Sequence, residues 1–166
     1  MDAEYEIRPY DPDADREGLW ALKRAFELGL GAGTGGDEKA RTYEDKLTDD
    51  YRAGYLEWVD RCVAEEPRAV TLAESGDDLV GYVFVLPESL SYVWDAAILN
   101  ELFVREPRRG TGVADDLLEA ALSVAREQDL PLDRLVLDVD EENERARAFY
   151  RRHGFEGWGE MVARKL

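Results

Sequence analysis

The sequence predicts a mixed α/β fold in which helices pack against one central sheet. Short runs of alternating or β-branched apolar residues take turns along the chain with longer segments whose apolar residues recur at helical spacing. No linker, repeat or low-complexity stretch divides the 166 residues, so we expect a single domain over residues 1–166. A chain of this length buries roughly two-thirds of its unfolded surface, which supports a hydrophobic core without disulfides or metal.

The chain is predicted to begin with a short strand and a helix. Residues 4–10 alternate polar and apolar side chains, as a half-buried strand does. Leu19, Leu22 and Phe26 then lie at helical spacing, and we expect the glycine-rich residues 29–36 to end this helix.

A second helix and a β-hairpin are expected next. The helix is predicted over residues 43–64, where apolar and aromatic side chains recur on one face. Two β-rich runs, residues 68–74 and 79–86, are joined by Ser75-Gly-Asp-Asp78, which is typical of a hairpin turn.

The second half is predicted to alternate strands with helices. In chain order we expect a strand over 96–104, a helix over 112–128, a strand over 132–139, a helix over 143–152 and a short pair of strands within 155–166. Gly154 suits the position just after a helix, where a left-handed backbone is common. The predicted element order is therefore β-α-α-β-β-β-α-β-α-β.

The charge balance excludes several classes of protein. Asp and Glu number 38 against 21 Lys and Arg, so the formal net charge at pH 7 is −17. Such a surface repels polyanions, which argues against binding to nucleic acid or to an anionic membrane. The acids are spread along the whole chain and only four of the basic residues are Lys. We therefore expect a protein from a halophile, although an ordinary acidic bacterial protein is the simpler alternative.

Cysteine and histidine each occur once, as Cys62 and His153. This excludes a disulfide within the chain and zinc sites built on Cys and His, and it leaves Cys–His chemistry only if these two distant residues meet. We expect no metal. The sequence shows neither a leader peptide nor an apolar run of 18 residues, so a cytoplasmic protein is expected.

The most informative stretch leads from a strand through a glycine-bearing turn into a helix. Gly110 and Gly112 allow the main chain to approach a ligand closely, and the amides at the following helix start have no internal partner. The helix dipole favours an anion there. Arg108 and Arg109 add positive charge to this otherwise acidic chain. A bound pyrophosphate would explain the combination, whereas the alternative is a plain turn with two solubilising arginines.

A second motif follows the next predicted strand. It reads Asn143-x-x-Ala-x-x-Phe-Tyr150-x-x-x-Gly-Phe155. In addition, Glu101 and Asp138 place carboxylates in strands that are otherwise apolar, where a charge is costly unless it is solvated, paired or functional.

Together these residues resemble the Gcn5-related N-acetyltransferases (GNAT superfamily), whose loop pattern (R/Q)-x-x-G-x-(G/A) is matched by residues 109–114. The resemblance implies a mixed, mostly antiparallel central sheet of about six to seven strands flanked by about four helices. It also implies transfer of an acetyl group from acetyl-CoA, the co-substrate, to a primary amine by direct attack in a ternary complex.

The resemblance also implies roles for individual residues. In the family, the loop amides hold the pyrophosphate of acetyl-CoA and the pantetheine arm lies along the preceding strand. The residues implied to bind the cofactor are Leu102, Phe103, Val104, Arg109, Gly110, Thr111, Gly112, Val113, Ala114, Asp115 and Asn143. Tyr150 is implied to be the general acid for the leaving thiolate, although a core position for Tyr150 and a helix cap for Asn143 are the simpler alternatives. Glu101, or otherwise Asp138, is implied to be the general base.

Some features stay open at this point. Asp115 and Asp116 would repel a phosphate if they pointed at it. Residues 31–36 fit the dinucleotide pattern G-x-G-x-x-G, but they follow a predicted helix, so we interpret them as a flexible connection bordering the acceptor pocket. The acceptor is a small-molecule amine, a protein N-terminus or a lysine, and a homodimer is compatible with the family. The rival hypothesis is a non-catalytic CoA-binding sensor or partner subunit with the same fold.

Overall fold

A five-stranded sheet forms the centre of the molecule, in the order β1-β2-β3-β4-β5. The computed structural model describes the backbone of residues 4–33 and 36–166, and their side chains except for residues 31–37. The strands are β1 (Glu6–Pro9), β2 (Val70–Ser75), β3 (Asp78–Val85), β4 (Ala97–Val104) and β5 (Leu135–Val136). Strands β1 to β4 pair antiparallel, whereas β4 and β5 pair parallel.

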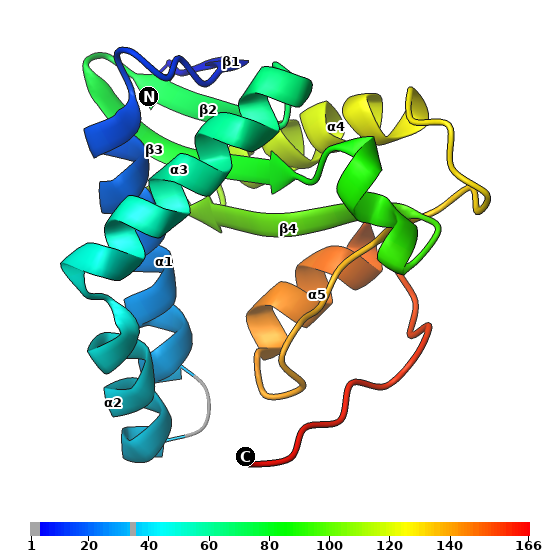
Figure 1. Ribbon diagram of the computed structural model, residues 1–166. Helices are drawn as coiled ribbons and strands as arrows, with labels where there is room; N and C mark the ends of the chain where they lie inside the picture. The colour runs from blue at the N-terminus through cyan, green and yellow to red at the C-terminus, as the bar shows by residue number, and fades with distance from the viewer. Residues whose placement is uncertain (1–3, 34–35) are drawn as a thin grey trace.

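Helices cover both faces of this sheet (Figure 1). They are α1 (Arg16–Gly33), α2 (Gly36–Lys46), α3 (Asp49–Glu65), α4 (Val113–Arg126) and α5 (Glu144–Arg152), with 3-10 turns η1 (Glu88–Val93) and η2 (Glu106–Arg108). Helices α1 and α3 pack on one face and α4 on the other, while α5 lies beside β4 (Figure 1). No helix of the described residues is both long enough and apolar enough to cross a bilayer.

The apolar core consists of two clusters, one on each face of the sheet. The first joins α1 and α3 to the sheet through buried residues that include Leu19, Leu22, Val59, Leu72 and Phe84. The second joins α4 to the opposite face through residues that include Val83, Val113, Leu117, Leu118 and Val124. Each fully buried side chain of this size contributes roughly 1.5–3 kcal/mol relative to an exposed one, so both helical layers are firmly held.

Two predicted boundaries in the first half are wrong. The single helix expected over residues 43–64 is two helices, because Thr48 caps α3 by accepting a hydrogen bond from the Tyr51 amide at 3.1 Å. Helix α1 continues through the expected break as far as Gly33. Its packing against α2 offsets the cost of helical glycines, about 1 kcal/mol each. Residues 34–35 of the expected connection lie outside the described residues.

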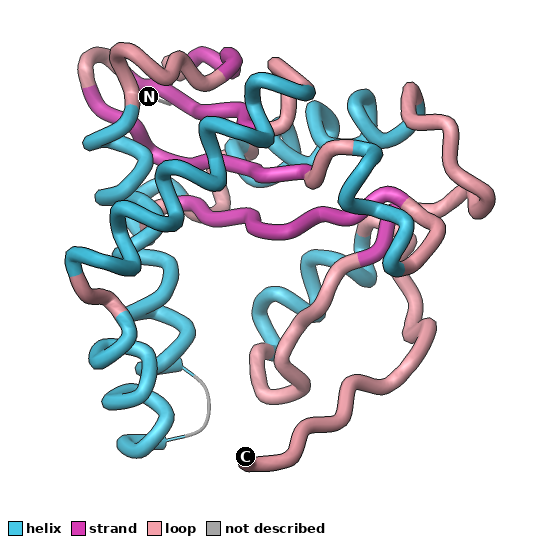
Figure 2. Tube along the Cα trace, in the orientation of Figure 1, coloured by secondary structure: helices cyan, strands magenta, loops and turns pink. Residues whose placement is uncertain are grey.

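The C-terminal part also departs from the prediction. The strand expected over residues 132–139 pairs only at Leu135–Val136, and within residues 153–166 there is no helix or strand (Figure 2). A strand needs a neighbour for its backbone hydrogen bonds, and β5 leaves β4 after two residue pairs. The expected terminal strand pair is therefore absent from the described residues, and the predicted six to seven strands and four helices are corrected to five strands and helices α1–α5.

A β-bulge in β4 changes which residues share a face. Phe84 pairs with Glu101, but the next residue of β3, Val85, pairs with Leu99, which leaves Asn100 as an extra residue in β4. Leu99 therefore packs in the α4 cluster, whereas Glu101 and Phe103 face α1 and α3. Simple alternation along the strand would place Leu99 and Glu101 on the same face, whereas the bulge places them on opposite faces.

Candidate active site

One edge of β4 is open next to the glycine loop. On its other edge β4 pairs with β3 along most of its length, but with β5 it shares only the pairs Ala97–Leu135 and Ile98–Val136. Beyond Ile98 the two parallel strands separate, and α5 lies below the free part of β4 (Figure 1). Residues 102–104 thus present backbone donors and acceptors on an edge that no described strand covers, as expected for a site that adds an extended ligand.

The open edge leads into the start of α4. Gly110 and Gly112 have φ angles of +78° and +93°, which residues with a side chain rarely adopt. Gly112 is the N-cap of α4, and the first hydrogen bond into the helix runs from the Asp116 amide to the Gly112 carbonyl at 3.1 Å. The amides of Val113, Ala114 and Asp115 precede that bond, so they have no partner within the helix. An anion fits this helix start.

The two arginines of the loop take different directions. Arg109 folds back on β4, where its Nε donates to the Val104 carbonyl at 3.1 Å and its guanidinium lies 5.9 Å from the centre of the Phe103 ring. Arg108 instead donates to the Ser75 hydroxyl at 3.0 Å. Of the pair, Arg109 is therefore the one held at the end of the open edge.

Helix α5 is fixed at both ends by its own sequence. The Asn143 side chain accepts a hydrogen bond from the Ala146 amide at 3.1 Å, so the alternative of a helix cap is confirmed. This cap uses the amide oxygen and leaves the NH2 group as a donor for another partner. At the other end, Gly154 has φ +86° and the Phe155 amide returns to the Tyr150 carbonyl at 3.0 Å.

Tyr150 is held between aromatic rings. The centres of the Phe149 and Phe155 rings lie 5.2 and 5.4 Å from the centre of its ring. Burial raises the pKa of Tyr150 to about 12, although the nearby charge of Arg145 opposes the shift. The phenol is therefore protonated at neutral pH, which a proton donor requires.

The acidic residues at the start of α4 have partners of their own. Asp115 accepts a hydrogen bond from Arg152 at 3.2 Å and lies 2.6 Å from the His153 ring nitrogen. Burial opposes ionisation of Asp115, but His153 and Arg152 outweigh it and lower the pKa of this carboxyl. Asp116 accepts from the Tyr5 hydroxyl at 2.5 Å. Both carboxylates are thus engaged by neighbouring side chains, and those of Arg152 and His153 connect α4 to the end of α5.

Glu101 belongs to a set of charged side chains that we call the charge cluster: the buried Lys23 and Glu27 of α1 and Glu101 of β4, and the partly exposed Lys46 of α2. Lys23 donates hydrogen bonds to both glutamates, and the Lys46 nitrogen lies 2.7 Å from Glu27. Lys23, Glu27 and Glu101 are only 4%, 4% and 6% exposed. The other oxygen of Glu101 accepts from the hydroxyl of Tyr55 at 2.6 Å and from that of Tyr82 at 3.3 Å.

The structure separates the two candidate bases. Glu101 is buried within the charge cluster, whereas Asp138 is exposed in the segment between β5 and α5. Lys23, Glu27 and Lys46 are not among the site residues predicted from the sequence. A usable signal was present: Lys23 and Glu27 lie four residues apart inside the apolar stripe of α1, where charged side chains must find partners.

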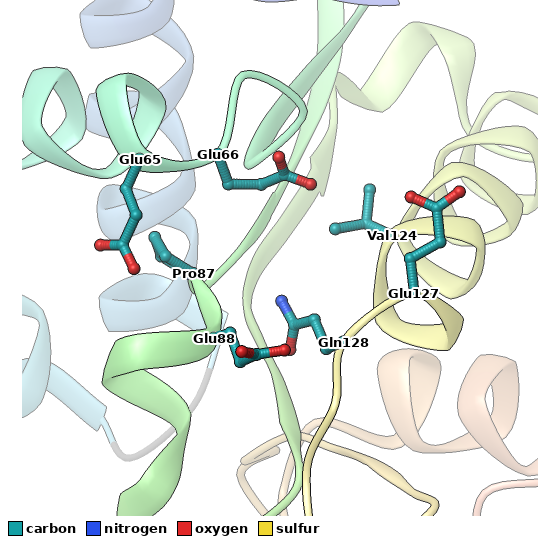
Figure 3. Close-up of a pocket in the computed structure, with 7 residues that line it drawn as sticks. All are labelled: Glu65, Glu66, Pro87, Glu88, Val124, Glu127 and Gln128. Carbon is teal, nitrogen blue, oxygen red and sulfur yellow. The ribbon is translucent and has the colours of Figure 1, made fainter.

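A separate cavity of about 290 Å³ lies at the far end of α4. Figure 3 shows its acidic lining, to which the ends of α3 and α4 and the start of η1 contribute Glu65, Glu66, Glu88 and Glu127. It is formed at the opposite end of α4 from the loop at residues 110–112 and shares no residue with the charge cluster. Across the described residues, no group of three or more His, Cys, Asp or Glu side chains is placed to hold a metal ion.

Solved N-acetyltransferases share this fold. The PaiA N-acetyltransferase of Thermoplasma acidophilum, in complex with coenzyme A, matches with a TM-score of 0.72 and 19% identity over 92% of this chain and 90% of that one. The aminoglycoside N-acetyltransferase AAC(6')-Iy, also with CoA, matches with a TM-score of 0.72 and 15% identity over 98% and 95%. A ribosomal-protein-alanine N-acetyltransferase from Brucella melitensis biovar Abortus 2308 matches with a TM-score of 0.60 and 20% identity over 98% and 100%.

The sequence itself identifies the family. A family model described as the acetyltransferase (GNAT) family matches residues 36–155, so this chain belongs to the GNAT acetyltransferases. The match includes the open part of β4, the glycine loop and all of α5. No curated protein matches the chain significantly.

Proposed function

We propose that this protein is an acetyl-CoA-dependent N-acetyltransferase that moves the acetyl group to a primary amine by direct attack in a ternary complex. The observation that carries the proposal is the continuous path from the open edge of β4 into the uncapped amides at the start of α4. An extended arm with amide groups matches the edge, and a pyrophosphate matches the helix start. Acetyl-CoA has both, and it supplies an acetyl group activated as a thioester.

The residues present fit this ligand. Leu102, Phe103 and Val104 offer the strand edge, and residues 110–115 offer the loop and helix amides. Arg109 adds a fixed positive charge where the two meet. The NH2 group of Asn143, which the helix cap leaves as a donor, is assigned to the carbonyl groups of the arm.

Three proton transfers balance the reaction: the nitrogen loses two protons and the sulfur gains one. The acceptor enters as an ammonium ion, and Glu101 takes its proton through a water molecule so that the amine can attack. The carbon–nitrogen bond then forms and the carbon–sulfur bond breaks. The hydroxyl of Tyr150 gives its proton to the leaving sulfur, and the second proton that the nitrogen loses as the amide forms restores this hydroxyl. Asp138 is the alternative base.

The acceptor class follows from charge and from the relatives. An acidic surface increases the rate of encounter with cations. Two structural relatives are named for aminoglycosides and for a ribosomal-protein alanine as acceptors. We therefore assign a cationic primary amine as the acceptor, and small polyamines, aminoglycosides and peptide N-termini form the screen.

The first test is calorimetric titration with acetyl-CoA and CoA. We expect binding that weakens about 10- to 100-fold in Arg109→Ala, because one charge-assisted hydrogen bond is worth roughly 1.5–3 kcal/mol. Arg108→Ala is the matched control and should bind nearly normally, since that side chain is directed to Ser75. If neither ligand binds the native protein, the proposal is wrong.

The second test is thiol release from acetyl-CoA with the amine screen. Turnover supports the enzyme, whereas tight CoA binding without turnover on any amine supports the sensor or partner subunit instead. Comparing Glu101→Gln with Asp138→Asn identifies the base, because only the variant that lacks it should lose the rise in rate with pH.

A further inference from the structure

The ammonium group of Lys23 lies at the centre of the charge cluster. It reaches from α1 to Glu101 on β4 and to Glu27 four residues along its own helix. The aromatic faces of Tyr55 and Phe26 lie 4.8 and 5.7 Å from the ammonium, measured to the ring centres. The ammonium of Lys23 thus contacts side chains of α1, α3 and β4, and it cannot move away from Glu101 without breaking these contacts.

The ionisable and charged groups around Glu101 come from several elements. In the described residues that pack against it they are Lys23 and Glu27 of α1, Tyr55 of α3 and Tyr82 of β3, with Lys46 of α2 reached through Glu27. Of these, Lys23 is the cation that touches Glu101. The charge cluster as a whole is neutral, with two ammonium groups against two carboxylates.

The protonation states agree with this arrangement. Burial alone would lower the pKa of Lys23, but Glu101 and Glu27 outweigh it and raise that pKa above its usual value. Burial raises the pKa of Tyr55 and of Tyr82, and the negative charge of Glu101 raises both further. Lys23 therefore stays charged, and the two phenols stay protonated as donors.

We propose that Lys23 is a positioning residue that keeps Glu101 ionised and oriented, so that this carboxylate is ready to accept the proton of the acceptor amine. The proposal rests on the proposed function, in which Glu101 is the base. Burial disfavours a charged carboxylate, and two phenol donors do not replace a cation. Without the ammonium, Glu101 takes up a proton more readily and stops serving as a base at neutral pH.

The decisive variant is Lys23→Met, which retains the apolar stem and removes the charge. Infrared spectroscopy reports the protonated form of a carboxyl group directly, through its C=O stretch, and needs no substrate. We expect a buried carboxylic acid band at neutral pH in Lys23→Met that is absent from the native protein. The band should vanish in Lys23→Met combined with Glu101→Gln, which assigns it to Glu101.

Three further variants separate charge from packing. Lys23→Arg retains the cation and should behave like the native protein. Lys46→Met removes an ammonium that touches Glu27 but not Glu101, so it should produce no band. If Lys23→Met does not fold, the double variant Lys23→Met/Glu27→Gln replaces it. This variant also removes the carboxylate of Glu27, which loses its contact with Lys23, so that Glu101 alone keeps its charge among Lys23, Glu27 and Glu101.

The pH profile of thiol release then connects this effect to catalysis. With acetyl-CoA and whichever screened amine reacts, the acid limb of kcat/KM should move upward by at least about one pH unit in Lys23→Met and return in Lys23→Arg. Acetyl-CoA binding should change less than about twofold. A rate that falls by the same factor at every pH, or no new carboxylic acid band, would overturn the proposal. If the native protein turns over no amine at all, the proposed function fails, whereas the infrared result still stands on its own.

Discussion

The two edges of β4 are built very differently. Toward β3 the strand is paired along most of its length, and the residues on both faces are buried in the two core clusters. Toward β5 it is paired at two residues only, and the segment beyond, with α5 and residues 153–166, is largely exposed. We call strands β1–β4 with α1, α3 and α4 the firm part of the fold. We call residues 135–166 the C-terminal arm.

Most of the buried core and part of the candidate site lie in different regions. Strands β1–β4 with α1, α3 and α4 contain nearly all of the fully buried side chains, whereas Asn143, Tyr150 and the exposed Asp138 belong to the C-terminal arm. The candidate site lies where the two regions meet. Substitutions of apolar core residues in the firm part should therefore act mainly on the free energy of unfolding, and those of Tyr150 and Asn143 in the arm mainly on turnover.

The largest effect is expected from Tyr150→Phe in the arm. Loss of the general acid should lower thiol release by about 10²- to 10⁴-fold, while the unfolding free energy stays within about 1 kcal/mol because the ring is retained. In the native protein the rate should not fall up to pH 9, since burial raises the pKa of Tyr150 to about 12. Unchanged turnover in Tyr150→Phe across pH 6 to 9 would remove the assignment.

In the firm part, Leu118→Ala should cost about 2–5 kcal/mol of unfolding free energy, measured in urea. Leu118 is 0% exposed in the α4 cluster. The control in the C-terminal arm is Val162→Ala, whose side chain is 82% exposed and whose loss should change stability by no more than about 0.5 kcal/mol. Equal effects at the two positions would contradict the division into a firm part and an arm.

The charge cluster predicts a pH dependence of stability. Burial opposes ionisation of Glu27, but Lys23 and Lys46 outweigh it and lower its pKa in the folded state. This stabilisation is complete above the unfolded pKa of about 4.3 and is lost as the pH falls through the lower folded value. Glu27→Gln should thus lower the free energy of unfolding by roughly 1–3 kcal/mol at pH 7. Urea titrations should show that this difference between the native protein and the variant becomes smaller below about pH 4.

The matching control for the cluster is Glu57→Gln. Glu57 pairs with Arg61 on the exposed surface, where such a pair contributes little. Its removal should change stability by a few tenths of a kcal/mol at either pH. If the difference in unfolding free energy between the native protein and Glu27→Gln does not vary with pH, the two lysines do not keep the Glu27 carboxylate ionised.

The smallest effect concerns the surface, which is acidic in both regions. The excess of acidic side chains gives a net charge of −17, and these side chains repel one another. Salt weakens this repulsion, because the screening length falls from about 10 Å at 0.1 M to about 3 Å at 1 M. The melting temperature should therefore rise with KCl between about 0.1 and 2 M, and by the same amount in Tyr150→Phe. A flat response would count against an origin in a salt-adapted organism.

The local patterns of the sequence predicted the parts that depend on local chemistry. The hairpin at residues 75–78, the start of α4 at a glycine and the end of α5 before Gly154 are confirmed. Each depends on a backbone angle or on amide donors that a short motif determines. The roles of Glu101, Tyr150 and Asn143 in catalysis and binding stay predictions.

Most of the wrong predictions depend on partners that are distant in the sequence. The exception is Thr48, a local cap that the apolar spacing hides because this spacing continues across it. Lys23 finds Glu101 across 78 positions of the chain, and no local pattern reports such a contact. A short pair of strands is expected within residues 155–166, yet a strand forms only where a neighbour offers its edge, and β5 leaves β4 after two residue pairs.

The extra residue at Asn100 has a geometric consequence for the charge cluster. Removing it would restore simple alternation, and every side chain on one side of that point would exchange faces of the sheet. Glu101 would then point among the leucines and valines beneath α4, away from Lys23 on α1. A single inserted residue therefore decides on which side of the sheet a negative charge is placed, and with it the helix that must supply the counter-charge.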